Sequence, residues 1–151
     1  MAGRYYEDFE VGEVIDSPDS YEITPERLHA FAAEFDPQPM HLDQEAGERS
    51  IFGKLVASGW QTLSVTMRLM VGSSLFASGE VVGIGIDNLR WLAPVEPGDV
   101  LRARAEVLSM RPSTSRPEQG YLTVLTTAHV NDKTVTSMET TMMVPRRPTS
   151  E

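Results

Sequence analysis

The segment from Leu55 to Gly79 carries a single charged side chain, Arg68. Apolar side chains recur along it at the three- and four-residue spacing of a helix face: Trp60, Leu63, Met67, Met70, Val71 and Leu75. A helix with almost no charge on any face has to be enclosed by other elements of structure. The polar residues within the segment, Ser58 and Gln61 among them, are too many for a lipid-facing helix, so a membrane span is not expected.

Strand patterns follow this segment to the end of the chain. Residues 81–91 are rich in Val, Ile and Leu, and residues 101–107 alternate apolar with charged side chains. Residues 121–130 and 134–144 flank a hairpin turn at Asn131-Asp132-Lys133. A long helix followed by four successive strands predicts an α+β fold with an antiparallel sheet. One apolar helix held in a curled antiparallel sheet is the hotdog arrangement.

A second helix is predicted nearer the N-terminus, after a short strand at residues 21–23. Thr24 is a favourable N-cap and Pro25 suits the first helical position. One apolar face follows at helical spacing, comprising Leu28, Phe31, Ala32 and Phe35. The helix has to stop at Asp36 because Pro37 follows. Residues 44–50 are compatible with a further helical turn.

Length and composition indicate one globular domain. The chain has 151 residues, 40% of them apolar and 23% charged. We expect the domain to span residues 1–145 and the tail, residues 146–151, to be frayed. The absence of cysteine excludes disulfides and thiolate metal sites, and a cytoplasmic location is the default expectation. The N-terminus has no apolar stretch of the kind found in secretory signals.

Charge is distributed unevenly along the chain. The net charge is −9, with −10 on residues 1–50 and +1 on residues 51–151. An acidic protein repels phosphate backbones, so nucleic acid is not an expected partner. The near-neutral second part can still offer arginine side chains to an anionic ligand.

One of the three histidines lies five residues after an acid, within Asp36-Pro37-Gln38-Pro39-Met40-His41-Leu42-Asp43. The two prolines predict an extended, rigid loop. Asp36 and His41 together could take up a proton and return it. The sequence leaves a second interpretation open, in which Asp36 ends a helix, His41 is a surface imidazole and Asp43 caps the next helix.

Three motifs together resemble one family. They are Asp36 with His41 and Asp43, then Phe52-Gly53-Lys54-Leu55-Val56-Ala57-Ser58-Gly59-Trp60, and the turn Pro94-Val95-Glu96-Pro97-Gly98-Asp99. The chain is similar over nearly its whole length to the MaoC-like acyl dehydratases, or (R)-specific enoyl-CoA hydratases. It departs from their pattern at Gln38, where Asn is usual, and at Ser58, where His is usual. The resemblance implies a hotdog fold and an acyl-CoA substrate.

The resemblance also implies roles for individual residues. Asp36 and His41 would hold a water molecule, and the backbone N–H of Gly59 would bind the thioester oxygen. From the residues alone, Gly59 is more simply a plain helix entry, and Ser58 is more simply an N-cap than a substrate contact. Gln38 could bond the thioester or satisfy its own loop.

Other polar residues offer weaker indications. Arg90, Arg111 and Arg116 are candidates for the phosphates of coenzyme A, although each is also compatible with solvated surface charge. His29 and His129 are expected to be structural or surface residues. Three histidines without metal-ligand spacing, and the lack of nucleotide-binding motifs, predict neither a metal nor a cofactor.

Three functions compete at this stage. The first is a hydro-lyase that acts across the 2,3 double bond of acyl-CoA thioesters. The second is a hotdog thioesterase, which needs a carboxylate on the central helix, whereas residues 58–77 contain none. The third is a non-catalytic acyl-CoA-binding subunit, against which the presence of both Asp36 and His41 counts. A single sheet of this size leaves one edge uncovered, so a homodimer is expected.

Overall fold

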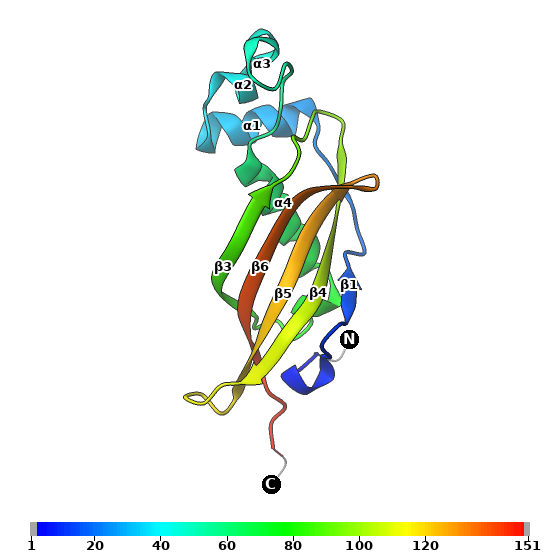
Figure 1. The fold of residues 1–151 in the computed structure, drawn as a ribbon, viewed down its shortest axis with the longest axis vertical. Coiled ribbons are helices and arrows are strands. Elements are labelled where there is room, and N and C mark those ends of the chain that lie inside the picture. The colour runs from blue at the N-terminus through cyan, green and yellow to red at the C-terminus, as the bar shows by residue number, and fades with distance from the viewer. Residues whose placement is uncertain (1–2, 150–151) are drawn as a thin grey trace.

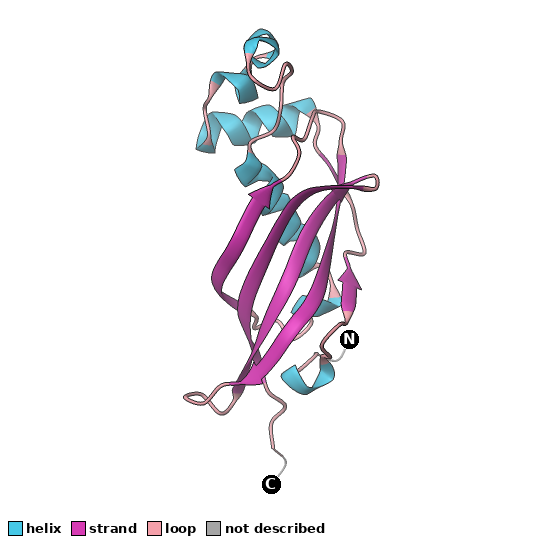
Figure 2. Cartoon of the chain, in the orientation of Figure 1, coloured by secondary structure: helices cyan, strands magenta, loops and turns pink. Residues whose placement is uncertain are grey.

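The computed structural model describes residues 3–149 (Figures 1 and 2). Its elements, in chain order, are η1 (Tyr6–Asp8), β1 (Val14–Asp16), β2 (Tyr21–Glu22), α1 (Pro25–Phe35), α2 (Pro39–Leu42), α3 (Gln44–Arg49), α4 (Gly59–Val71), η2 (Ser74–Phe76), β3 (Val82–Trp91), β4 (Val100–Pro112), β5 (Gln119–Val130) and β6 (Lys133–Pro145).

The strands form one antiparallel sheet in the order β1-β4-β5-β6-β3, with β2 also paired to β4. The tight turn between β5 and β6 places Asn131 in the left-handed region, at φ 53°, a conformation that Asn tolerates. Figure 1 shows α4 running along one face of the curved sheet, with α1, α2 and α3 grouped beyond its end. The predicted α+β hotdog arrangement is therefore confirmed.

Local signals account for both predicted helices. Thr24 accepts a hydrogen bond from the Arg27 N–H at 3.2 Å, Pro25 opens α1, and the helix stops before Asp36 as predicted. Ser58 caps α4 by accepting from the Trp60 N–H at 3.2 Å. The helix ends at Val71, earlier than the apolar pattern suggests, because a second cap at Ser73 begins the separate turn η2.

The core lies between α4 and the sheet. Val65, Leu69 and Met70 of α4 are buried against strand residues such as Leu101 and Val124. One flank of α4, toward the edge strand β3, is left open in the single chain: Trp60 is 58% exposed and Met67 53%. The expectation that α4 is enclosed on every side is therefore wrong for one chain, because the sheet covers only one of its faces.

Two predictions for local structure are corrected by the fold. The segment between Asp36 and Asp43 is not an extended loop, because Pro39 opens the helical turn α2, which carries His41. Proline is favourable at this first helical position, where no backbone donor is needed. The tail is not frayed at its start, since Arg146 and Arg147 pair with Glu7 and Asp8. Residues 150–151 lie outside the described residues.

Within residues 3–149, no helix is long and apolar enough to cross a bilayer.

Gly47 in α3 lies directly against the backbone of the segment that leads to α4. A Cβ atom at Gly47 would lie 2.6 Å from the backbone N and Cα of Leu55. Gly47→Ala is therefore expected to lower the free energy of unfolding by about 1–3 kcal/mol, measured by urea titration, because backbone has to move. Gly83→Ala is the control, since a Cβ there meets nothing within 4 Å. Equal stability of the two variants would contradict this packing.

Candidate active site

Asp36 lies at the C-terminal end of α1, where its side chain is only 16% exposed. Its Oδ2 accepts a hydrogen bond of 2.7 Å from the Ser58 hydroxyl, and its Oδ1 accepts one of 2.7 Å from the Gln38 amide. Both carboxylate oxygens are thus engaged, by donors that precede α2 and α4. The Ser58 hydroxyl has two roles. Its oxygen accepts the hydrogen bond that caps α4, and its O–H donates to Asp36.

His41 is buried, with 6% of its side chain exposed. Its Nδ1 lies 2.7 Å from the carbonyl oxygen of Val56, which can only accept a hydrogen bond, so Nδ1 carries a proton. Nε2 faces Oδ2 of Asp36 at 3.4 Å. In the neutral imidazole this nitrogen is unprotonated and can receive a proton, and the imidazolium that forms then faces a carboxylate.

Opposing effects act on the Asp36 carboxyl. Burial raises its pKa, but hydrogen bonds from Ser58 and Gln38, together with the positive charge that His41 can carry, outweigh burial and bring the pKa below the ordinary 3.8. Asp36 is therefore a fixed negative charge at neutral pH. This charge lies beside Nε2 of His41.

The N-terminus of α4 opens beside this pair. Gly59 is the first residue of the helix, and such residues present a backbone N–H without an intrahelical partner. A Cβ atom at position 59 would lie 2.4 Å from Nε1 of Trp91, so the indole ring leaves no room for a side chain there. A side chain at this position would therefore require the Trp91 indole to move.

These groups line one cavity of about 500 Å³. Its walls include Asp36, His41, Gly59, Trp60, Trp91 and Pro94. They come from α1, α2, the start of α4 and the end of β3, which gather at one end of the sheet (Figure 1). The cavity thus combines a proton-accepting imidazole, a fixed carboxylate and a helix N-terminus, as needed to move a proton beside an oxygen that gains negative charge.

Comparison with known proteins identifies the family. The model of the MaoC-like domain matches residues 8–137. The chain belongs to the MaoC-like family. It superposes with a TM-score of 0.91 on the crystal structure of a MaoC-like dehydratase from Rhodospirillum rubrum, at 40% identity, covering 97% of this chain and all of that one.

Two relatives with named activities are similar over almost the full length of this MaoC-like chain. A 3-hydroxybutyryl-CoA dehydratase from Methylorubrum extorquens is 30% identical over 146 residues, covering 95% of this chain and 85% of the relative. An (R)-specific enoyl-CoA hydratase from Rhodospirillum rubrum is 26% identical over 145 residues, covering 95% and 94%.

The structure brings together most of the predicted site. Asp36, His41, Gln38 and Gly59 all line the cavity, and Ser58 reaches Asp36 from the head of α4. Of the two interpretations of residues 36–43, a surface imidazole is wrong, since His41 is buried, whereas Asp43 does cap α3. The side-chain amide of Gln38 donates its hydrogen bond to Asp36 within the same segment, which is the local role that the sequence left open. The N-cap role of Ser58 is confirmed, and its bond to Asp36 was not predicted.

The predicted arginines are not gathered at this site. Arg90 lies on the exposed edge strand β3, next to Trp91 in sequence. Arg111 stacks on the Tyr121 ring at 4.2 Å, on the extended end of β4, and Arg116 lies in the loop that follows. Figure 1 shows that loop at the opposite end of the sheet from α2. Arg111 and Arg116 therefore do not line the cavity that contains Asp36, and their contact with the phosphates of coenzyme A stays a prediction.

The remaining histidines lie elsewhere. His29 is exposed on α1, and His129 on β5 bonds to Thr127 and Thr134. Burial lowers the pKa of His129 and the nearby charge of Arg104 lowers it further, against a smaller opposite effect of Asp16. Among residues 3–149, no cluster of three or more His, Asp or Glu side chains is arranged to hold a metal ion.

The lowered pKa of Asp36 predicts how stability depends on pH. A carboxyl whose pKa is lower in the folded chain stabilises it above the unfolded-state pKa, and loses this effect as pH falls through the folded-state value. The difference in unfolding free energy between wild type and Asp36→Asn should therefore be constant above pH 3.8 and shrink below it. Urea titrations over a pH series test this. A pH-independent difference for Asp36→Asn would contradict the assignment.

Proposed function

We propose that this chain is a hydro-lyase that adds or removes water across the 2,3 double bond of an acyl-CoA thioester. The observation that carries the proposal is the buried Asp36–His41 pair, 3.4 Å apart, in a cavity that also contains the first residue of α4. The names of the MaoC-like relatives support the reaction class.

His41 is the proton acceptor in this proposal. In the hydration direction, a water oxygen forms a bond to C3 of the enoyl thioester while one of its protons passes to Nε2 of His41. The double-bond electrons move toward the thioester carbonyl and generate an enolate, and a proton returned from the site to C2 completes the addition. Asp36 is less suited to take the proton, because both its oxygens already accept hydrogen bonds and its pKa is lowered.

The enolate oxygen would be held by the backbone N–H of Gly59. A helix N-terminus combines a free donor with partial positive charge. One such donor can contribute about 3 kcal/mol to the transition state. Dehydration uses the same contacts in reverse, with His41 returning its proton to the departing hydroxyl.

The geometry is less favourable to a thioesterase. A hotdog thioesterase would use a carboxylate on the central helix to direct water at the thioester carbonyl, and α4 contains neither Asp nor Glu. Asp36 approaches the cavity from α1 instead. The site therefore supports attack at C3 more strongly than attack at the carbonyl carbon.

We further propose that the working form is a homodimer. Strand β3 is an edge of the sheet, and nearly all of its residues are exposed. Large exposed apolar side chains lie on it and at the end of α4, namely Val82, Ile84 and Val71. An unpaired edge with an apolar surface of this kind is suited to pairing with the same edge of a second copy.

The dimer proposal predicts the effect of a charge on β3. Ile84→Glu, at a position that is 51% exposed, should convert the dimer to monomers in sedimentation velocity, because it buries a charge in the paired edge. Val11→Glu is the matched control, since Val11 is 64% exposed in a turn before β1. A monomeric wild type, or the same loss of dimer in both variants, would contradict the proposal.

The catalytic roles predict paired losses of activity. Asp36→Ala and His41→Ala should each lower kcat/KM for hydration by roughly 10²- to 10⁴-fold. The rate is measured from the loss of absorbance of the conjugated enoyl thioester. The double variant should be little worse than either single one, because the two side chains act as a unit.

His29→Ala is the control for removing an imidazole, because His29 is exposed on α1. It should retain wild-type turnover. Full activity of Asp36→Ala or His41→Ala would refute the assignment. A wild-type protein that binds acyl-CoA but hydrates none of a broad enoyl-CoA panel would favour the non-catalytic binding subunit instead.

A further inference from the structure

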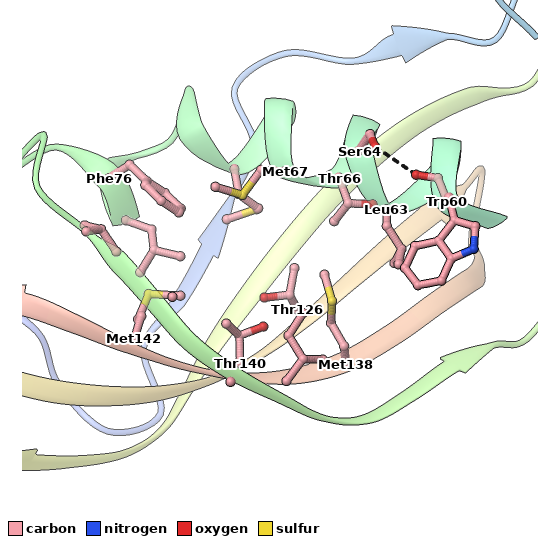
Figure 3. Close-up of a pocket in the computed structure, with 16 residues that line it drawn as sticks. Trp60, Leu63, Ser64, Thr66, Met67, Phe76, Thr126, Met138, Thr140 and Met142 are labelled. Atoms are coloured by element: carbon pink, nitrogen blue, oxygen red, sulfur yellow. Dashed lines mark hydrogen bonds between the residues drawn. The ribbon is translucent and has the colours of Figure 1, made fainter. Parts of the chain in front are cut away.

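A second hollow lies beside the cavity that holds Asp36 and His41. It has a volume of about 580 Å³ and is enclosed by α4, η2 and the inner side of β3, β5 and β6. Figure 3 shows its apolar walls, with Met67 and Phe76 facing Met142 across it and Leu63 facing Met138. We call it the apolar groove. Ser64, Thr66, Thr126 and Thr140 also line it, but no charged side chain does. Such a groove is chemically suited to a hydrocarbon chain.

Trp60 borders both hollows. It is the second residue of α4, so its ring stands directly after the Gly59 backbone. In Figure 3 the ring lies at one end of the groove, beside Leu63. Its exposure, 58%, is consistent with a side chain that faces open space on two sides. A chain that leaves a thioester held at Gly59 has to pass this ring to enter the groove.

The ring of Trp60 is held by a second tryptophan. The Trp60 and Trp91 ring centroids are 5.5 Å apart at an interplanar angle of 75°, an edge-to-face contact. Trp91 itself lies directly against Gly59. The Trp60 ring, which lines both hollows, therefore forms a partition between the site cavity and the apolar groove, with the Trp91 ring packed against it on the side of the site cavity.

We propose that Trp60 sets the acyl-chain length that the site accepts, by closing the site cavity against the apolar groove. The inference rests on the proposed function, since it takes the bound thioester to lie at Gly59. Wild type accordingly favours short acyl groups, which end before the partition. Removal of the Trp60 ring joins the two hollows and gives a long acyl chain an apolar surface along α4.

The chain's composition supplies a direct probe. It contains two tryptophans, and both belong to the partition. Intrinsic tryptophan fluorescence thus reports only on this place in the fold. Titration with the saturated thioesters butanoyl-CoA and dodecanoyl-CoA measures binding without any turnover, in wild type and in Trp60→Ala, where Trp91 remains as the reporter.

The expected result is a reversal of preference. Wild type should bind butanoyl-CoA more tightly than dodecanoyl-CoA, and Trp60→Ala should improve the ratio in favour of dodecanoyl-CoA by about tenfold or more, because buried methylenes are gained. Thr140→Phe is designed to fill the apolar groove, which Thr140 lines from β6. Alone it should leave butanoyl-CoA binding unchanged, and combined with Trp60→Ala it should cancel the gain for dodecanoyl-CoA.

An unchanged ratio in Trp60→Ala would overturn the inference, as would a gain that persists when Thr140→Phe is added. Failure of both thioesters to bind wild type and variant would overturn it together with the proposed function. A reversal of binding preference in a protein that hydrates neither butenoyl-CoA nor dodecenoyl-CoA would uphold the role of Trp60 and refute the hydro-lyase proposal alone.

Discussion

The hydrogen bond from Ser58 to Asp36 connects the parts of the molecule on which the site depends. Its donor is the residue that caps the central helix, and its acceptor is the residue that ends α1. The 2.7 Å bond spans 22 positions of the chain and fixes the carboxylate relative to the first backbone N–H of α4. Because the same Ser58 oxygen accepts from the Trp60 N–H, helix capping and placement of the carboxylate are coupled.

This coupling has a chemical consequence. A carboxylate that accepts from both Ser58 and Gln38 is stabilised as an anion, and it is more effective at stabilising an adjacent imidazolium than at removing a proton itself. His41 is oriented independently, through Nδ1 and the carbonyl of Val56. Two separate anchors thus hold Nε2 and Oδ2 3.4 Å apart, close enough for one water molecule beside them to contact both. The two positions at which this chain differs from the usual family residues, Gln38 and Ser58, are the two hydrogen-bond donors to Asp36. Both side chains found here donate a hydrogen bond to its carboxylate.

Elements with strong local signals could be predicted from the sequence. The N-cap at Thr24 and the proline at position 37 define α1, and the Asn131 turn defines the β5–β6 hairpin, because each depends on neighbours in the chain. The family resemblance pointed to Asp36, His41 and Gly59, and the structure places all three around one cavity. They share a cavity because the fold that the resemblance implies brings α1, α2 and the start of α4 together.

Features that depend on tertiary contacts could not be predicted. The bond from Ser58 to Asp36 needs α1 and α4 to cross, and Trp91 reaches Gly59 only because β3 ends beside the head of α4. Strand β1 is too short to carry a pattern of its own, and it forms by pairing with β4. The ion pairs of Arg146 and Arg147 with the first helical turn join the two ends of the chain, which no local pattern reports.

The central claim is that water adds to C3 of a thioester that stays intact. It is tested most directly by incubating the wild-type protein with butenoyl-CoA in water labelled with heavy oxygen and analysing the product by mass spectrometry. The account predicts one labelled oxygen in the 3-hydroxyl group of a 3-hydroxyacyl-CoA, with the thiol still bound. Label in a free carboxylate together with released coenzyme A would show attack at the carbonyl carbon and contradict the account, as would recovery of unlabelled substrate alone.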